Sequence, residues 1–85
     1  MTDTPIALIS GGAQGIGLAC AEALAEDGFT VILADIQETV VDTAATLGGA
    51  GYVCDFGDPD AILALFDRIE AEHGPVSALV NTAGI

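Results

Sequence analysis

The sequence predicts an α/β protein built on a parallel sheet of the Rossmann type, in the order β-α-β-α-β-α-β. Three observations predict this class. Four short apolar runs alternate with three segments of helical periodicity. A glycine-rich turn joins the first apolar run directly to the first helical segment. Each apolar run ends in small or polar residues, as expected where parallel strands form a ligand-binding edge. Single helical crossovers predict right-handed connections, helices on both faces and the strand order 3-2-1-4.

The first strand and helix flank the glycine-rich turn. Ile6 to Ser10 is a nearly continuous apolar run, which suits a strand buried on both faces. The helix is expected from Gly15 to Asp27, with Gly28 just past its end. Helical spacing predicts one apolar stripe made of five residues: Ile16, Ala19, Cys20, Ala23 and Leu24.

The second unit repeats the pattern with a weaker helix. An apolar strand is expected from Phe29 to Ala34, and Asp35 stands at its end. The helix is expected from Gln37 to Leu47, although its valines and threonines lower its propensity. Gly48 and Gly49 end it. Three of its residues share one apolar face: Val40, Ala44 and Leu47.

The third helix has the clearest boundaries. A short strand, Gly51 to Cys54, precedes it. Asp58 can cap the helix and Pro59 suits its first turn. The Gly74-Pro75 pair stops it, and the last strand is expected from Val76 to Val80. Its apolar stripe is predicted to contain four residues: Ile62, Leu65, Phe66 and Ile69.

Composition limits the partners of this chain. It has 85 residues, a formal net charge of −12, and Arg68 as its only lysine or arginine. Such a surface repels nucleic acid and anionic membranes, so neither is expected as a partner. No apolar run is long enough for a membrane span, and the first residues do not resemble a signal peptide, so a cytoplasmic location is expected. Cys20 and Cys54 lack metal-like spacing and are expected to be reduced thiols, with no metal site.

The glycine-rich turn predicts a phosphate-binding loop. Glycine allows a tight turn and lets the backbone approach an anion. The helix that follows points unpaired N–H groups and the positive end of its dipole at the ligand. Because cations are almost absent, backbone amides would have to hold any phosphate. The alternative is a tight turn without a ligand.

Asp35 is the second candidate. It lies 18 residues after Gly17, at the end of a strand. This position matches the acid that binds both ribose hydroxyls of an adenine dinucleotide. Its carboxylate would repel a 2′-phosphate, and Ile36, Gln37 and Gln14 offer no compensating positive charge. The combination favours NAD over NADP. The alternative is a charge at a helix N-terminus.

Two further candidates follow the third and fourth strands. Asp55 could accept a hydrogen bond from an adenine amino group, with the Phe56 backbone nearby. The small residues of Asn81 to Gly84 permit close approach to a ligand. The alternatives are a solvated turn aspartate and an ordinary turn.

Three other polar residues are assigned no chemistry. Ser10 has no histidine or lysine base beside it and is expected to brace the loop through an exposed hydroxyl. His73 is expected to be a surface residue at a helix end. Arg68 is expected on an exposed helical face, near Glu72 at i+4.

These motifs, in this order, resemble the N-terminal part of a short-chain dehydrogenase/reductase. The family motif Thr-Gly-x-x-x-Gly-Ile-Gly corresponds to Ser10 to Gly17, and the family's two strand-end acids correspond to Asp35 and Asp55. The Asn-Asn-Ala-Gly motif corresponds to Asn81 to Gly84. Two departures are mild: serine replaces the first threonine, and threonine replaces the second asparagine.

The resemblance implies an NAD(P)(H)-dependent oxidoreductase that moves hydride between nicotinamide and an alcohol or carbonyl. It implies that the glycine loop holds the pyrophosphate, that the strand-two acid binds the ribose and that the strand-three acid lies at the adenine. It also implies that the last motif runs along the cofactor toward the nicotinamide. The predicted cofactor-binding residues are Gly11, Gln14, Gly15, Ile16, Gly17, Asp35, Ile36, Asp55, Phe56, Asn81, Ala83 and Gly84.

The family's catalytic serine and Tyr-x-x-x-Lys pair lie beyond the Asn-Asn-Ala-Gly motif. We therefore expect residues 1–85 to form the N-terminal part of a larger, doubly wound Rossmann domain that is inactive alone. The alcohol or ketone substrate and a homo-oligomer would depend on the missing C-terminal part. One alternative is a non-catalytic nucleotide-binding module or a degenerate remnant. Another is a structural subunit whose open edge, Val76 to Val80, pairs with another chain.

Overall fold

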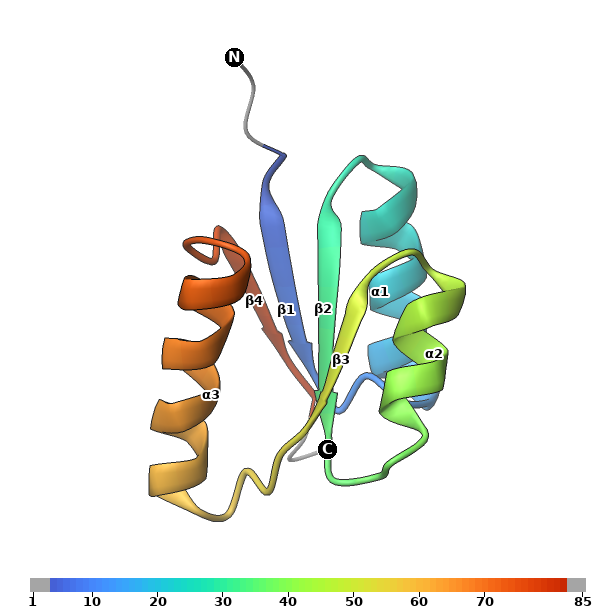
Figure 1. Cartoon of the computed structure of the whole chain (residues 1–85). Coiled ribbons are helices and arrows are strands. Elements are labelled where there is room, and N and C mark those ends of the chain that lie inside the picture. Colours follow the sequence, from blue (N-terminus) through green and yellow to red (C-terminus); the bar gives the residue numbers. More distant parts are fainter. Residues whose placement is uncertain (1–3, 83–85) are drawn as a thin grey trace.

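The computed structural model describes residues 4–82 and contains one parallel four-stranded sheet (Figure 1). The strand order is β3-β2-β1-β4, which confirms the predicted order 3-2-1-4. The elements in chain order are β1 (Ile6–Ser10), α1 (Gly15–Glu26), β2 (Thr30–Asp35), α2 (Val40–Thr46), β3 (Ala50–Val53), α3 (Pro59–Glu72) and β4 (Ala78–Asn81).

Helices cover both faces of the sheet, α1 and α2 on one side and α3 on the other (Figure 1). All five residues of β1 are buried, as its apolar run predicts for a central parallel strand. Successive β1 side chains point to opposite faces. Leu8 packs in the core beneath α3 with Leu65 and Ile69, whereas Ile9 packs in the core beneath α1 and α2.

Two predicted elements begin two or three residues away from their observed starts, and the other predicted bounds of helices and strands agree to within one residue. The second helix begins at Val40, not Gln37, because residues 36–39 form a bend and a turn in which the Val40 N–H donates to the Gln37 carbonyl at 3.1 Å. The last strand is β4 at Ala78–Asn81, not residues 76–80. Its register with β1 begins where Ala78 lies opposite Ala7. Just before it, the Ser77 N–H donates to the carbonyl of Ile6, the first residue of β1, at 2.8 Å.

The apolar stripe predicted for α1 is wrong for three of its five residues, although Leu24 does pack against the core. Gly17 and Ala21 are the buried residues of this helix. The helix is apolar around most of its circumference, so periodicity alone does not fix its rotation. Close packing does: a Cβ at Gly17 would lie 2.1 Å from the Gly11 carbonyl oxygen, so only glycine fits there. This rotation leaves three predicted stripe residues exposed: Ile16, Ala19 and Ala23.

The third helix follows its sequence signals closely. The Asp58 side chain accepts a hydrogen bond from the Asp60 N–H at 3.0 Å, which confirms the N-cap, and Pro59 occupies the first turn. Leu65 and Ile69 are fully packed against the sheet. The capped helix thereby fixes the loop that joins it to β3.

The fourth strand is an edge of the sheet. It pairs with β1 on one side and has no second partner among residues 4–82. Leu79 lies opposite Leu8, yet 57% of Leu79 is exposed, which fits the open apolar edge predicted from the sequence. Within the same residues, no helix is long and apolar enough to cross a membrane.

Candidate functional site

A groove of about 860 Å³ lies at the carboxyl edge of the sheet. All ten of the predicted site residues that the structure describes line it: Gly11, Gln14, Gly15, Ile16, Gly17, Asp35, Ile36, Asp55, Phe56 and Asn81. The other two predicted residues, Ala83 and Gly84, lie outside the described residues. Thr82, from the predicted Asn81 to Gly84 stretch, also lines the groove. The sequence did not predict four further lining residues: Gln37, Cys54, Gly57 and Ile62.

The glycine loop forms one wall of the groove. The Gly11 N–H donates to the Ala34 carbonyl at 2.7 Å, which ties the start of the loop to β2. Gly11 and Gly15 have φ values of +74° and +64°, a region that favours glycine. Together with the close approach of Gly17 to Gly11, these conformations account for the spacing of glycines along the loop.

The N-terminus of α1 opens onto this groove. An α-helix leaves its first N–H groups without intrahelical acceptors. Gln14, the N-cap residue, makes no side-chain cap, and the first turn carries no acidic residue. By contrast, α2 and α3 each carry an aspartate in the first turn. The chain has a net charge of −12. An anion at the N-terminus of α1 would nevertheless meet no carboxylate from the first turn of that helix.

Asp35 links the groove to the glycine loop. One carboxylate oxygen accepts from the Ala13 N–H and the other from the Gln37 N–H, both at 3.1 Å. Each oxygen has a second lone pair, so the carboxylate can still accept bonds from a ligand. The contact with Ala13 joins residues 22 apart in the sequence, and no local pattern signals it.

Asp55 and Phe56 line the groove just before α3 begins. Asp55 is exposed, and its carboxylate accepts from the Gly57 N–H at 2.8 Å, which closes a tight turn. Phe56 is half-buried and packs against the core beneath α3. Burial, together with Asp55 and Asp58, raises the pKa of the neighbouring Cys54 thiol above its ordinary value.

The end of β4 is joined to the end of β1 through side chains. Ser10 is buried rather than exposed as its sequence suggested, because its hydroxyl lies between strands and donates to the Asn81 side-chain oxygen at 2.7 Å. The Thr82 hydroxyl lies 2.7 Å from the Ser10 carbonyl oxygen and 3.4 Å from that of Gly11. The Ser10 hydroxyl therefore contacts β4 at Val80 and Asn81, and not the glycine loop as predicted. Thr82 has contacts that the sequence did not predict.

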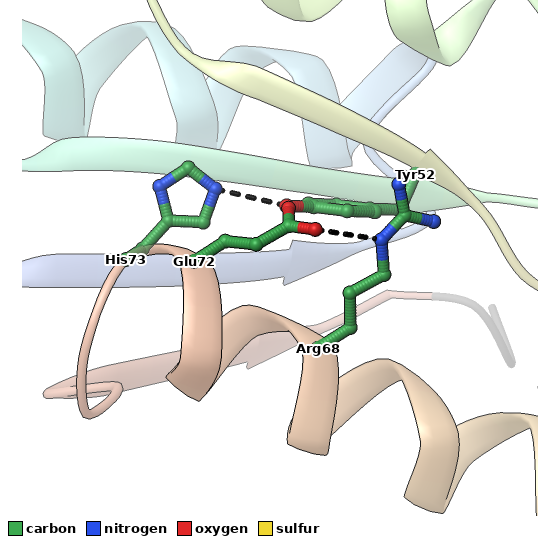
Figure 2. A network of polar contacts seen from close by, with 4 residues as sticks. All are labelled: Tyr52, Arg68, Glu72 and His73. Carbon is green, nitrogen blue, oxygen red and sulfur yellow. Dashed lines mark hydrogen bonds and ion pairs between the residues drawn. The ribbon is translucent and has the colours of Figure 1, made fainter.

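A second polar cluster lies outside the groove and joins β3 to α3 (Figure 2). Tyr52 donates to the Glu72 carboxylate at 2.5 Å and lies 2.9 Å from the Nε2 of His73. Because the Tyr52 proton goes to Glu72, the contact with His73 requires a proton on Nε2. Arg68 pairs with Glu72 at 3.0 Å, as i+4 spacing predicts, and its guanidinium carbon lies 4.9 Å from the centre of the Tyr52 ring.

This cluster shifts the pKa values of its members in opposite directions. Burial of Tyr52 and its hydrogen bond to the Glu72 carboxylate raise the pKa of Tyr52 to about 12. The hydrogen bonds that Glu72 accepts from Tyr52 and Arg68 lower the pKa of Glu72. The chain's only tyrosine is thus held as a neutral donor away from the groove.

Comparison with known proteins gives a consistent result. A family model described as short chain dehydrogenase matches residues 5–85. The cis-4-hydroxycyclohexanecarboxylate dehydrogenase of Sinomonas cyclohexanicum is 41% identical to this chain in the matched region. The match covers 94% of this chain and 34% of that enzyme. The chain spans about a third or less of the length of the curated relatives it matches.

Solved structures match over almost the whole chain. A Streptococcus agalactiae protein named as a 2-keto-3-deoxy-D-gluconate dehydrogenase has a TM-score of 0.86 at 39% identity, covering 98% of this chain and 34% of that one. A Brucella melitensis protein named as a ribose-5-phosphate isomerase has a TM-score of 0.91 at 36% identity, covering 99% of this chain and 33% of that one.

Proposed function

Because this chain belongs to the short-chain dehydrogenase family of oxidoreductases, whose members normally bind a nicotinamide cofactor, we propose that its groove holds NAD(H) for hydride transfer to or from an alcohol or carbonyl. The observation that carries this proposal is the single groove that brings together the glycine loop, the start of α1 and Asp35.

The glycine loop would hold the pyrophosphate. Gly11 and Gly15 have the positive φ values that shape the loop, and a Cβ at Gly17 would collide with the loop itself. The first-turn amides of α1 supply donors and a favourable dipole, without a carboxylate in that turn. This arrangement suits an anion in a chain with only one cationic side chain.

Asp35 would bind the adenosine ribose and select NAD over NADP. Its carboxylate lines the groove and retains acceptor capacity beside its two backbone bonds. A 2′-phosphate at this position would face a negative charge. Arg68, the only arginine, is paired with Glu72 in the cluster outside the groove and does not line it.

The rest of the cofactor would follow the groove in two directions. Asp55 and Phe56 would contact the adenine, beside Ile36. Asn81, with Ala83 and Gly84, would lie along the cofactor toward the nicotinamide. When bound, NAD(H) supplies or accepts the hydride, and these residues bind and orient it.

The proton transfer that accompanies hydride transfer needs another group. Tyr52 is engaged by Glu72 outside the groove and is not available for it. We assign this step, and contact with the substrate, to the part of the protein that corresponds to the remaining length of its relatives. Relatives named for a hydroxycyclohexanecarboxylate and a 2-keto-3-deoxy-gluconate support an alcohol or carbonyl substrate.

The test measures the dissociation constants of NAD⁺ and NADP⁺ by titration calorimetry on the purified protein. We expect NAD⁺ to bind more tightly. Asp35→Asn should weaken NAD⁺ binding about tenfold, the order expected when a charged hydrogen-bond acceptor is lost. Asp67→Asn is the matched control, because Asp67 is an exposed residue of α3 outside the groove. Absence of NAD⁺ binding, or equal binding of NADP⁺, would contradict the proposal.

A second measurement separates an enzyme from a binding module. The intact protein is incubated with a panel of alcohols and ketones, and NADH is followed by absorbance. Turnover of any member supports the oxidoreductase proposal. Tight NAD⁺ binding without turnover across the panel would favour the non-catalytic module instead.

A further inference from the structure

Thr82 occupies a corner between the end of β1, the glycine loop and the first turn of α1. Its backbone N–H donates to the Ser10 carbonyl at 3.1 Å, and its hydroxyl lies 2.7 Å from the same oxygen. The hydroxyl also lies 3.4 Å from the Gly11 carbonyl oxygen, 71 positions earlier in the sequence. One residue therefore contacts both carbonyls at the start of the loop.

The same hydroxyl faces the first turn of α1. Its oxygen would lie 2.8 Å from a Cβ placed on Gly17, and the Gly11 carbonyl oxygen would lie 2.1 Å from that Cβ. Thr82, Gly11 and Gly17 thus meet at one point. Gly11 has φ of +74°, a conformation that glycine can leave without a steric penalty. Its N–H is held by the Ala34 carbonyl on one side, and its own carbonyl lies against the Thr82 hydroxyl on the other.

We propose that Thr82 is a positioning residue for the phosphate-binding loop, acting through the Ser10 and Gly11 carbonyls. This inference rests on the proposed function, because it assumes that the loop binds a pyrophosphate. A carbonyl oxygen that turned toward the groove would repel an anion there. The Thr82 hydroxyl has one proton to donate, and it lies 2.7 Å from the Ser10 oxygen and 3.4 Å from the Gly11 oxygen. By holding both oxygens on its side, it leaves the N–H groups of the loop and helix as the groups presented to the ligand.

The proposal makes the end of β4 part of the phosphate site. The Ser10 carbonyl keeps its bond from the Thr82 backbone if the hydroxyl is removed, so β1 and β4 should stay paired. The loss would fall on the loop rather than on the sheet. A positioning role therefore predicts that the free energy of ligand binding falls by more than the free energy of unfolding.

The test compares Thr82→Val, which keeps the shape but removes the hydroxyl, with Thr82→Ser, which keeps the hydroxyl. Thr46→Val is the matched control, since the Thr46 hydroxyl also donates to a backbone carbonyl, at 2.6 Å, but in α2 and outside the groove. Calorimetry gives the affinities for NAD⁺, ADP and adenosine, and urea unfolding gives stability.

We expect Thr82→Val to weaken NAD⁺ and ADP about fivefold, the order expected for one lost hydrogen bond, and to leave adenosine unchanged because it carries no phosphate. Thr82→Ser and Thr46→Val should bind all three ligands as the wild type does. Hydrogen exchange should quicken at residues 11–17 in Thr82→Val only.

Several outcomes would overturn the positioning role. They are a Thr82→Val variant that binds NAD⁺ normally, a Thr82→Ser variant that is equally weakened, and an adenosine affinity that falls in parallel. Each of these leaves the proposed function intact, provided that the wild type binds NAD⁺. A wild type that fails to bind NAD⁺ overturns the proposed function and the positioning role with it.

Discussion

The groove and the Tyr52 cluster are built from different parts of the chain. In the groove, the main structural groups are backbone amides and carbonyls, held by glycines and by short side chains such as Asp35 and Thr82. In the Tyr52 cluster, long side chains reach across from α3 to β3, and Tyr52 contacts the other three residues (Figure 2). The start of α1 leaves N–H donors facing the groove, whereas the polar groups of the Tyr52 cluster bond to one another.

This difference supports the proposal that the groove binds a ligand and that the Tyr52 cluster stabilises the fold. A polar group that is already satisfied within the protein gains little from a ligand. The start of α1, without a side-chain cap or a first-turn acid, keeps its capacity for an anion. The hydroxyl of Tyr52 has Glu72 and His73 as partners. Substitutions in the Tyr52 cluster should therefore change stability alone, whereas those that disturb the groove should change ligand binding.

The largest expected effect is that of Gly17→Ala. The added Cβ would lie 2.1 Å from the Gly11 carbonyl oxygen, and backbone on both sides must move to relieve it. We expect a loss of roughly 3 kcal/mol in the free energy of unfolding, the upper range for overpacking, and no measurable NAD⁺ binding. Urea unfolding and calorimetry check the two effects.

Gly57→Ala is the matched comparison within the same groove. A Cβ there would meet only the Asp55 carboxylate oxygen, at 3.2 Å, and a side chain can yield. This variant should stay folded and keep NAD⁺ binding within about threefold, because overpacking is mild where neighbours can move. Equal loss in both variants would show that close packing of α1 on the loop is not the cause.

Tyr52→Phe should lower stability and leave NAD⁺ binding unchanged. It removes the hydroxyl that contacts Glu72 and His73 but keeps the buried ring. We expect the free energy of unfolding to fall by about 1–2 kcal/mol, since a hydrogen bond to a charged group is lost. NAD⁺ affinity should not change, because Tyr52 does not line the groove. A weakened affinity would show that the two regions are coupled.

The pH dependence of the free energy of unfolding above pH 10 provides a control for the Tyr52→Phe prediction. The pKa of Tyr52 is about 12 in the fold, against an ordinary value of 10.0. A raised pKa means that the neutral form is favoured in the folded state, so its stabilising contribution is complete below pH 10 and is lost as the pH rises toward 12. The wild type should lose this increment over that interval, and Tyr52→Phe should not.

The sequence predicted the sheet and the groove well because their signals are local. Apolar runs that end at glycines or acids placed the strands, and the resulting order brought Gly15 and Asp35 to one edge. The rotation of α1 was missed because apolar residues surround that helix, and only the packing of Gly17 on the loop decides which face is buried. The contacts of Thr82 and Tyr52 join residues 72 and 20 apart through single side chains, and periodicity contains no information about them.

The smallest expected effect is that of Glu72→Gln, which sharpens the comparison by separating charge from hydrogen bonding. The amide oxygen can still accept from Tyr52, whereas the ion pair with Arg68 is lost. In the wild type the pKa of Glu72 is lowered below its ordinary 4.5, so its contribution is present above that pH and is lost as the pH falls through the folded-state value. Glu72 and Arg68 are largely exposed, so solvent screens this contribution and it should be small.

Urea unfolding across the acid range measures this contribution. The free energy of unfolding should depend slightly less on pH for Glu72→Gln than for the wild type, and the difference should shrink in high salt. A loss as large as that of Tyr52→Phe, unchanged by salt, would show that the carboxylate charge and not the tyrosine hydroxyl holds α3 to β3.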